Sequence, residues 1–265
     1  MKRTIHFLVA ALLLLIVNDK NLHSQSHEGY YMQIEYINID DEMLPEFQNH
    51  IGATLKPLQE SKIENDLVKE WYIYRVSYPS KLDLNYNYIS IAISDDLNKF
   101  AESSSSNNPT HTSVHHSGMP DVLKEIMGSM HSELWSINNS VLTSMDAKPT
   151  RFLLMDYMDV APGMDYAYQM MEDEIARPLH QLRMEEDTME GWEVYDLIIP
   201  GGTEYGYNFA TGNFFERLSD LEFGFTDEMI RQNHPDTDIN EFNENINRTR
   251  DLVRSEVWEL IDYAK

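Results

Sequence analysis

Two acidic side chains in matching segments of the chain are the candidates for acid–base chemistry. Glu35 and Asp156 each lie in a short, apolar, β-rich segment, residues 31–39 and 152–160. A carboxyl group in a partly dry site has a raised pKa, which suits a general base that removes a proton next to a carbonyl group. We expect Arg75 either to stabilise the developing negative charge or to pair with one carboxylate and keep it ionised and inert.

Further polar and aromatic residues on the predicted strands are candidates for ligand contacts. Strand alternation assigns them to the face that meets the other half of the chain, and a mixed polar and apolar face is typical of a ligand-lined cavity. The two tryptophans could stack on a flat ligand or act as packing anchors, and the polar residues could be structural. The candidate ligand-binding residues are Gln33, Trp71, Asn87, Trp192, Asp196 and Asn208.

A histidine group in residues 102–120 is the weak candidate for a metal site. His111, His115 and His116 have a spacing that can ligate zinc or copper if they fold onto a helix. The surrounding Ser, Asn, Thr and Pro residues instead favour a loop without supporting hydrogen bonds. We therefore predict no metal site and no cofactor.

An internal repeat indicates how the chain positions these residues. Residues 31–93 match residues 152–214 without gaps at an offset of 121, and the identical pairs include Tyr36 with Tyr157. A second block, residues 132–137, matches residues 255–260 at an offset of 123. The repeat predicts two units, residues 30–141 and 151–265, with residues 102–120 as an insertion in the first.

Each unit has the same predicted order of elements, βαββαβ, which is the split ferredoxin-like unit. The predicted strands are residues 31–39, 71–78 and 86–93 in the first unit and residues 152–160, 192–199 and 207–215 in the second. The predicted helices are residues 43–58 and 121–131 in the first unit and residues 164–184 and 245–254 in the second. Trp135 and Trp258 mark the fourth strands. Pro57 and Pro178 should kink or interrupt the first helices, because proline lacks an N–H group and clashes with the preceding turn. Strand alternation further places the apolar set on the face toward these helices: Met32, Ile34, Tyr36, Tyr74, Val76, Tyr78, Leu153, Met155, Tyr157, Tyr195, Leu197 and Ile199.

The repeat, the element order and the Trp-x-x-Tyr-x-x-x-x-Pro pattern at Trp71 and Trp192 resemble the dimeric α+β barrel superfamily. That superfamily includes antibiotic-biosynthesis-type monooxygenases, haem-degrading monooxygenases, stress-responsive barrel proteins and NIPSNAP-type proteins. The resemblance implies an α+β fold in which two tandem ferredoxin-like units pack sheet to sheet as an intramolecular barrel. It covers both units but is fold-level evidence, because these barrels host unrelated chemistries.

Composition and the first residues limit the partners and the compartment. The formal net charge of −25 excludes nucleic acid and anionic membranes as partners, since both repel an acidic surface. A charged start followed by the apolar run of residues 7–17 predicts a signal peptide over residues 1–25, and hence a periplasmic or secreted protein. The absence of cysteine excludes disulfides and thiolate metal sites.

These observations favour an exported protein that binds a small, mostly apolar organic molecule between its two units. One alternative is a cofactor-independent monooxygenase or isomerase that acts on a small organic substrate in the barrel lumen. Another is a structural module whose lumen is filled by side chains. The expected state is a monomer with a pseudo-dimeric barrel, or a homo-oligomer.

Overall fold

The computed structural model describes residues 26–81, 84–105, 121–144, 148–202, 204–235 and 238–265. The predicted signal peptide and the histidines at positions 111, 115 and 116 lie outside the described residues. Among the described residues, no helix combines the length and the apolar character that crossing a membrane requires.

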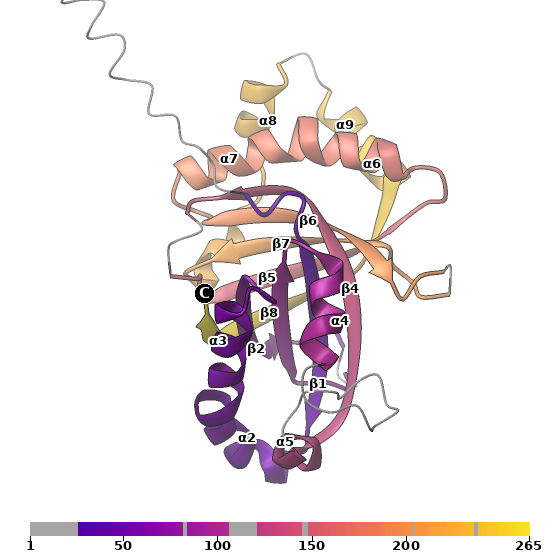
Figure 1. The fold of residues 1–265 in the computed structure, drawn as a ribbon. Helices are drawn as coiled ribbons and strands as arrows, with labels where there is room; N and C mark the ends of the chain where they lie inside the picture. The colour runs from indigo at the N-terminus through magenta and orange to yellow at the C-terminus, as the bar shows by residue number, and fades with distance from the viewer. Residues whose placement is uncertain (1–25, 82–83, 106–120, 145–147, 203, 236–237) are drawn as a thin grey trace, which may run out of the picture.

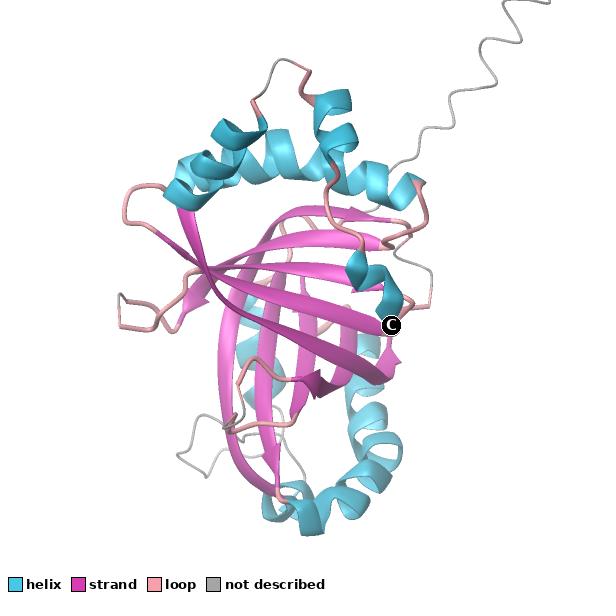
Figure 2. Cartoon of the chain, turned by 180° about the vertical axis from the view of Figure 1, so that it is seen from behind, coloured by secondary structure: helices cyan, strands magenta, loops and turns pink. Residues whose placement is uncertain are grey.

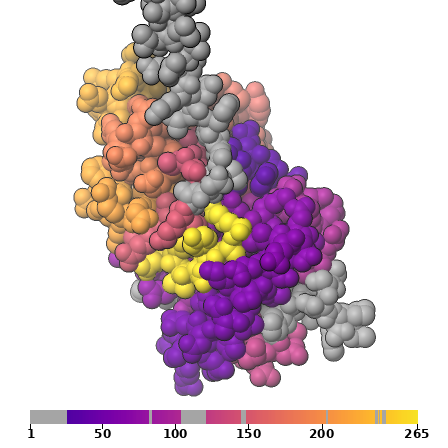
Figure 3. Space-filling model, turned by 60° about the vertical axis from the view of Figure 1, so that its left-hand side comes forward, coloured from indigo at the N-terminus to yellow at the C-terminus, as the bar shows by residue number. Residues whose placement is uncertain are grey.

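The described strands close into one antiparallel barrel, as Figures 1 and 2 show. The strands are β1 (Tyr31–Ile39), β2 (Glu70–Tyr78), β3 (Tyr88–Ser94), β4 (Met127–Leu142), β5 (Phe152–Val160), β6 (Gly191–Ile199), β7 (Phe209–Phe215) and β8 (Arg250–Ala264). Around the barrel their order is β1-β3-β2-β8-β5-β7-β6-β4. The long strands β4 and β8 each pair with strands of both halves, so they hold the halves together. Figure 3 shows the C-terminal part of the chain, in yellow, lying between the two halves.

The two halves pair their strands in the same register. Glu35 on β1 lies opposite Ser90 on β3, and Asp156 on β5 lies opposite Thr211 on β7, both 121 residues further along the chain. Positions related by the sequence repeat therefore occupy corresponding places in the barrel. This allows the two halves to be compared residue by residue.

Helices cover the outer face of each half. In the first half, η1 (Asp41–Met43), α2 (Leu44–His50), the π-helical turn η2 (Ile51–Leu55) and α3 (Lys56–Glu64) run without a break. In the second half α6 (Asp165–Met171), the π-helical turn η3 (Glu172–Ala176) and α7 (Arg177–Glu185) do the same, and they lie across β6 and β7 in Figure 1. Each π turn directly precedes the proline-containing segment, so Pro57 and Pro178 are accommodated by a local widening of the helix.

The remaining helices are separate segments, and the bounds of two of them differ from the prediction. They are α4 (Leu97–Ser105), α5 (Asp121–Ile126), η4 (Leu218–Glu222), α8 (Asp227–Asn233) and α9 (Ile239–Thr249). The helices predicted over residues 121–131 and 245–254 end at Ile126 and Thr249, because β4 and β8 begin directly afterwards. His131 therefore lies on strand β4 instead of at the end of the predicted helix.

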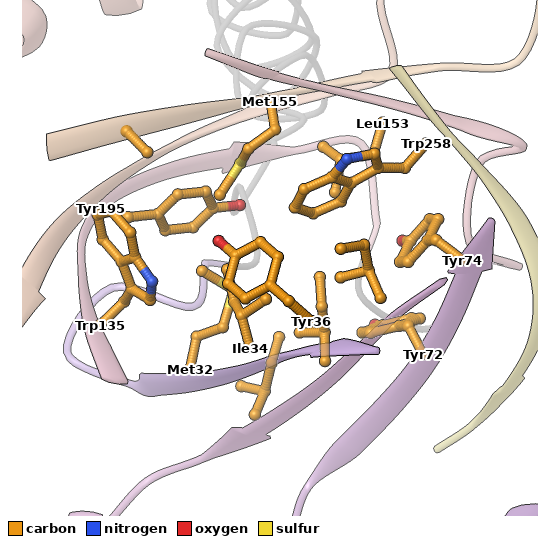
Figure 4. Close-up of a cluster of buried hydrophobic side chains, with 14 of the residues drawn as sticks. Met32, Ile34, Tyr36, Tyr72, Tyr74, Trp135, Leu153, Met155, Tyr195 and Trp258 are labelled. Atoms are coloured by element: carbon orange, nitrogen blue, oxygen red, sulfur yellow. The ribbon is translucent and has the colours of Figure 1, made fainter. Parts of the chain in front are cut away.

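The barrel lumen is filled in its middle by aromatic and apolar side chains, shown in Figure 4. Tyr36 and Tyr157 meet there, with their hydroxyl oxygens 2.8 Å apart. Trp135 and Trp258 are fully buried beside them. The hypothesis of a filled lumen is therefore supported for this part of the barrel.

The side chains alternate along the strands as predicted, but the two faces are exchanged. Tyr36, Tyr74 and Tyr195 were assigned to the helix-facing core, and they line the lumen. Trp71 and Trp192 were assigned to the shared interior, and they pack beneath the helices instead. Both faces of these strands are covered by apolar layers, so alternation separates the faces without showing which one is inside.

Buried carboxylates satisfy the tyrosine and tryptophan groups at one end of the lumen. Glu133 accepts hydrogen bonds from Tyr36 (2.6 Å), from the Trp135 indole (3.0 Å), and from the hydroxyls of Tyr205 and Tyr207. Correspondingly, Glu256 accepts hydrogen bonds from the Tyr86 hydroxyl (2.7 Å) and from the Trp258 indole (3.1 Å). Each half thus contributes one carboxylate to a network that closes this end of the barrel.

Candidate functional site

The first-half candidates lie outside the lumen and apart from those of the second half. Glu35 accepts a hydrogen bond from Gln33 (3.2 Å) on the outer face of β1. Arg75 is half exposed and forms an ion pair of 2.7 Å with Glu259 across the junction of β2 and β8. The structure therefore does not bring Glu35, Asp156 and Arg75 together as one catalytic group.

Several predicted ligand contacts are occupied by structural hydrogen bonds. The side chain of Asn87 bonds both the N–H and the carbonyl oxygen of Ile39, and Asn208 does the same with Val160. Trp71 is fully buried and donates to Ser90 (3.1 Å). These three side chains fix the strands and the helix packing of the barrel.

Asp196 lies beside helix α6 instead of in the lumen. Gln169 donates a hydrogen bond of 2.7 Å to one of its carboxylate oxygens, and the other oxygen is buried. Burial is the main cause that raises the pKa of Asp196 to about 6.

A cavity of about 290 Å³ lies between the outer face of the second-half sheet and its covering helices. Asp156 and Trp192, two of the predicted site residues, line it together with Glu172, His180 and Arg250. Apolar side chains make up much of the remaining wall: Leu154, Met158, Met171, Ile175, Phe215, Leu221, Phe223, Phe225 and Ile246. An apolar cavity with a few convergent polar groups is the usual form of a small-molecule site, and this volume is near the lower end of the usual range.

Two carboxyl groups in this cavity have raised pKa values. Glu172 is buried on the π turn, and desolvation raises its pKa to about 7, although the nearby Tyr168 hydroxyl and Arg250 partly oppose the shift. Burial also raises the pKa of Asp156, which is held by hydrogen bonds from Ser255 and Asn213. A carboxyl group with a pKa near 7 can exchange a proton with a bound molecule at neutral pH.

Three nitrogen atoms around the cavity lack hydrogen-bond partners within the described residues. They are Nδ1 of His180, Nε of Arg183 and Nε of Arg250. Desolvation and the charge of Arg183 hold the pKa of His180 well below its usual value, so this imidazole is neutral. Buried polar atoms usually have a partner, so unsatisfied nitrogens around one cavity indicate a place for oxygen atoms of a ligand or water.

The matching positions of the first half explain why the cavity forms in the second half. Ile51 and Leu55 are buried at the positions that correspond to Glu172 and Ala176. The smaller alanine leaves space beneath the helix, and the glutamate brings a charge to its edge. Asn213 likewise replaces the alanine at position 92.

Sequence reasoning missed Glu172, His180, Arg183 and Arg250. These residues could have been found by searching for positions at which the two repeats differ in polarity. A glutamate at the position of Ile51 in an otherwise apolar helix face is such a difference.

Replacing Glu172 with glutamine should change how stability depends on pH. The pKa of Glu172 is higher in the folded protein than in the unfolded chain, so wild-type stability is fully retained below about pH 4.5 and decreases as the pH rises to about 7. Relative to Glu172→Gln, the wild-type protein should lose up to about 3 kcal/mol of unfolding free energy over this interval. Urea denaturation at pH 4.5 and pH 8 measures the difference, and parallel curves for the two proteins would contradict the assignment.

Comparison with known proteins supports the fold. No protein-family model and no curated protein matches the chain. A candidate monooxygenase from Fusobacterium nucleatum superposes with a TM-score of 0.54 at 8% identity, over 89% of this chain and 94% of that one. A candidate monooxygenase from Lactobacillus acidophilus gives a TM-score of 0.50 at 9% identity, over 89% and 96% of the two chains. The chain therefore shares an α+β barrel fold with these two structures.

The expectation that no cofactor is involved is corrected by the same comparison. The matches include a haem-binding protein from Thermus thermophilus, with a TM-score of 0.49 at 9% identity over 90% of this chain and 94% of that one. The cavity side chains, however, do not fit a haem as they stand. The His180 ring is stacked on Trp192 (4.9 Å between centroids) and has Phe225 against it (4.8 Å), and about 290 Å³ is small for a porphyrin. We assign no haem chemistry to this chain.

Proposed function

We propose that this protein binds a small, mostly apolar organic molecule in the cavity between the second-half sheet and helices α6 and α7. The observation that carries this proposal is the convergence of Glu172, Asp156 and three unsatisfied nitrogen atoms on one apolar cavity. The cavity lies outside the lumen, so filling of the barrel interior does not compete with it. We further propose, as the sequence predicts, that the halves are tandem ferredoxin-like units and that the protein is exported.

The polar groups of the cavity define the chemistry of the bound molecule. Arg183 and Arg250 carry positive charge and have unused N–H groups, so they favour a carbonyl, enol or carboxylate oxygen. Glu172 and Asp156 favour a molecule that presents a hydrogen-bond donor or an acidic proton. A ring or short chain bearing a carbonyl group satisfies both sets and leaves its apolar part against the walls.

A second candidate function is catalysis of proton transfer on the bound molecule, in an isomerase or a monooxygenase. It is favoured by the pKa of about 7 at Glu172, which makes this carboxylate a usable base at neutral pH. In the first step Glu172 or Asp156 would take a proton from the carbon next to the carbonyl group. The arginines would stabilise the enolate oxygen that forms.

Native mass spectrometry of the purified protein tests the binding function. We expect the wild-type protein to retain a small molecule and the variant Ala176→Leu to lose it, because leucine at this position fills the space as Leu55 does in the first half. The matched control is Leu55→Ala, which alters the corresponding place in the first half. Binding of single-ring ketones and carboxylic acids, measured by calorimetry, should weaken at least tenfold in Ala176→Leu and should stay unchanged in Leu55→Ala.

Equal retention and equal affinity in wild type and Ala176→Leu would contradict the proposal. Circular dichroism of each variant checks that it is folded. If Ala176→Leu is unstable, Thr211→Val removes a polar wall group at similar volume and offers a milder change of the same cavity.

A further inference from the structure

A second, smaller cavity opens at the end of the barrel lumen opposite the Glu133 network. Its volume is about 130 Å³, and its walls are lumen side chains, among them Met32, Tyr74, Leu153 and Tyr195. The segment after β4, including Thr143 and residues 148–150, lies at the cavity. An apolar cavity of about 150 Å³ binds benzene in an engineered protein, so this volume suits a single ring.

Ionisable side chains also line the cavity, and they are His27, Lys148, Glu190, Glu193 and Lys265. His27 is 4% exposed, and its Nδ1 is 2.6 Å from a carboxylate oxygen of Glu193. Glu193 also accepts hydrogen bonds from Ser140 (2.9 Å) and Tyr195 (2.7 Å). The main chain beside His27 is held in place, because the N–H of Gly29 donates to the Ile137 carbonyl oxygen (2.9 Å).

The other nitrogen of His27 has no hydrogen bond to any residue that the structure describes. Nε2 is buried, and the nearest carboxylate oxygen, on Glu70, is 3.4 Å away without the geometry of a hydrogen bond. Burial alone would lower the pKa of His27, but the charges of Glu193 and Glu70 and the close contact with Glu193 outweigh it and raise the pKa to about 10. Nε2 therefore carries a hydrogen at neutral pH, and it has the ion-pair contact with Glu70 at 3.4 Å but no hydrogen bond among the described residues.

The charges around this donor select the type of acceptor. Glu70 and Glu193 already place two negative charges beside His27, and Lys265 lies 3.7 Å from Glu70. A neutral carbonyl oxygen can accept from Nε2 without adding a further negative charge beside Glu70 and Glu193. An anionic carboxylate would meet repulsion from both glutamates.

From these observations we infer that the lumen cavity is a second binding site, which takes a single-ring or similarly small apolar molecule whose carbonyl oxygen accepts a hydrogen bond from His27. This site is separate from the sheet–helix cavity and does not depend on the function proposed for it. It faces the interior shared by the two halves, whereas the sheet–helix cavity belongs to the second half alone.

Methionine methyl NMR can distinguish the two sites in one experiment. Met32 lines the lumen cavity, while Met158 and Met171 line the sheet–helix cavity. The probes are acetophenone, ethylbenzene and benzoate, of which the first two have nearly the same shape and differ in the carbonyl oxygen. Acetophenone should shift the Met32 signal saturably and bind about tenfold more tightly than ethylbenzene at that site. Benzoate should bind there more weakly than acetophenone.

Variants test the role of His27. The double variant His27→Phe with Glu193→Gln removes the donor without leaving Glu193 charged, and it should abolish the preference for acetophenone over ethylbenzene. Ile93→Phe reduces the volume of the cavity and should weaken all three probes at Met32 while leaving Met171 unaffected. Both results would support the inference.

Other outcomes would overturn it. Equal affinity for acetophenone and ethylbenzene in the wild-type protein would remove the role of His27, and the absence of any saturable shift of Met32 would remove the site. If acetophenone shifts Met158 and Met171 only, the lumen site is wrong and the proposed function stands. If acetophenone shifts Met32 only, the lumen site stands and the sheet–helix cavity does not bind this class of molecule.

Discussion

Replacing Glu133 with alanine is expected to destabilise the protein by about 3–5 kcal/mol, which corresponds to a fall of roughly 10 °C in Tm. Four donors converge on this carboxylate, and two of them belong to Tyr36 and Trp135, which are almost fully buried. Removing the acceptor leaves the Trp135 indole unpaired and leaves Tyr36 with the Tyr157 hydroxyl alone, and each buried donor that loses its partner costs about 1–3 kcal/mol. Glu133→Gln should lower the unfolding free energy by less, because the amide oxygen of glutamine can still accept some of these hydrogen bonds.

Thermal and urea denaturation followed by circular dichroism measure this effect. The control is Glu46→Ala, an exposed glutamate on α2, which should change the unfolding free energy by less than about 0.5 kcal/mol. A loss below about 1 kcal/mol for Glu133→Ala would show that the network at this end of the lumen contributes little to stability.

Proton exchange on a bound ketone is expected to depend on the carboxyl groups of the sheet–helix cavity. If the protein is an enzyme, it should catalyse deuterium incorporation next to the carbonyl group of a ligand in heavy water. Glu172→Gln or Asp156→Asn should lower that rate by about 10²–10⁴-fold while binding persists, since general-base catalysis contributes about this factor. The readout is loss of the corresponding proton signal in NMR.

Glu35→Gln is the matched control for Asp156→Asn. Glu35 occupies the corresponding strand position in the first half, outside the cavity, so its replacement should leave exchange unchanged. An equal loss of rate in Glu35→Gln would contradict the assignment to the second-half cavity. Binding without any exchange in the wild-type protein would favour a binding protein over an enzyme.

The sequence predicted the strands well because their signals are local. The predicted bounds of β1 and β5 agree with the structure, and both prolines mark irregular turns in the first helices. The starts of β4 and β8 were missed, since their first residues are held as strands by pairing with β1 and β5, which lie far away in the sequence. Tertiary pairing, which no local signal records, decided those boundaries.

The site was predicted only in part, for a physical reason. Asp156 and Trp192 were selected because they are polar or aromatic members of an alternating strand, and both line the cavity. The face was misassigned because both sides of the sheet are buried. Glu172 and His180 lie on a helix that reads as ordinary apolar packing, and their role becomes visible only when the space around Ala176 is known.

The position of the bound molecule in a crystal structure of the ligand-loaded protein tests the central claim most directly. Density for the ligand between the second-half sheet and helices α6 and α7, with an oxygen within hydrogen-bond distance of Arg183 or Arg250 and a contact to Glu172 or Asp156, is the predicted result. A ligand found elsewhere, with this cavity filled by repacked side chains, would contradict it.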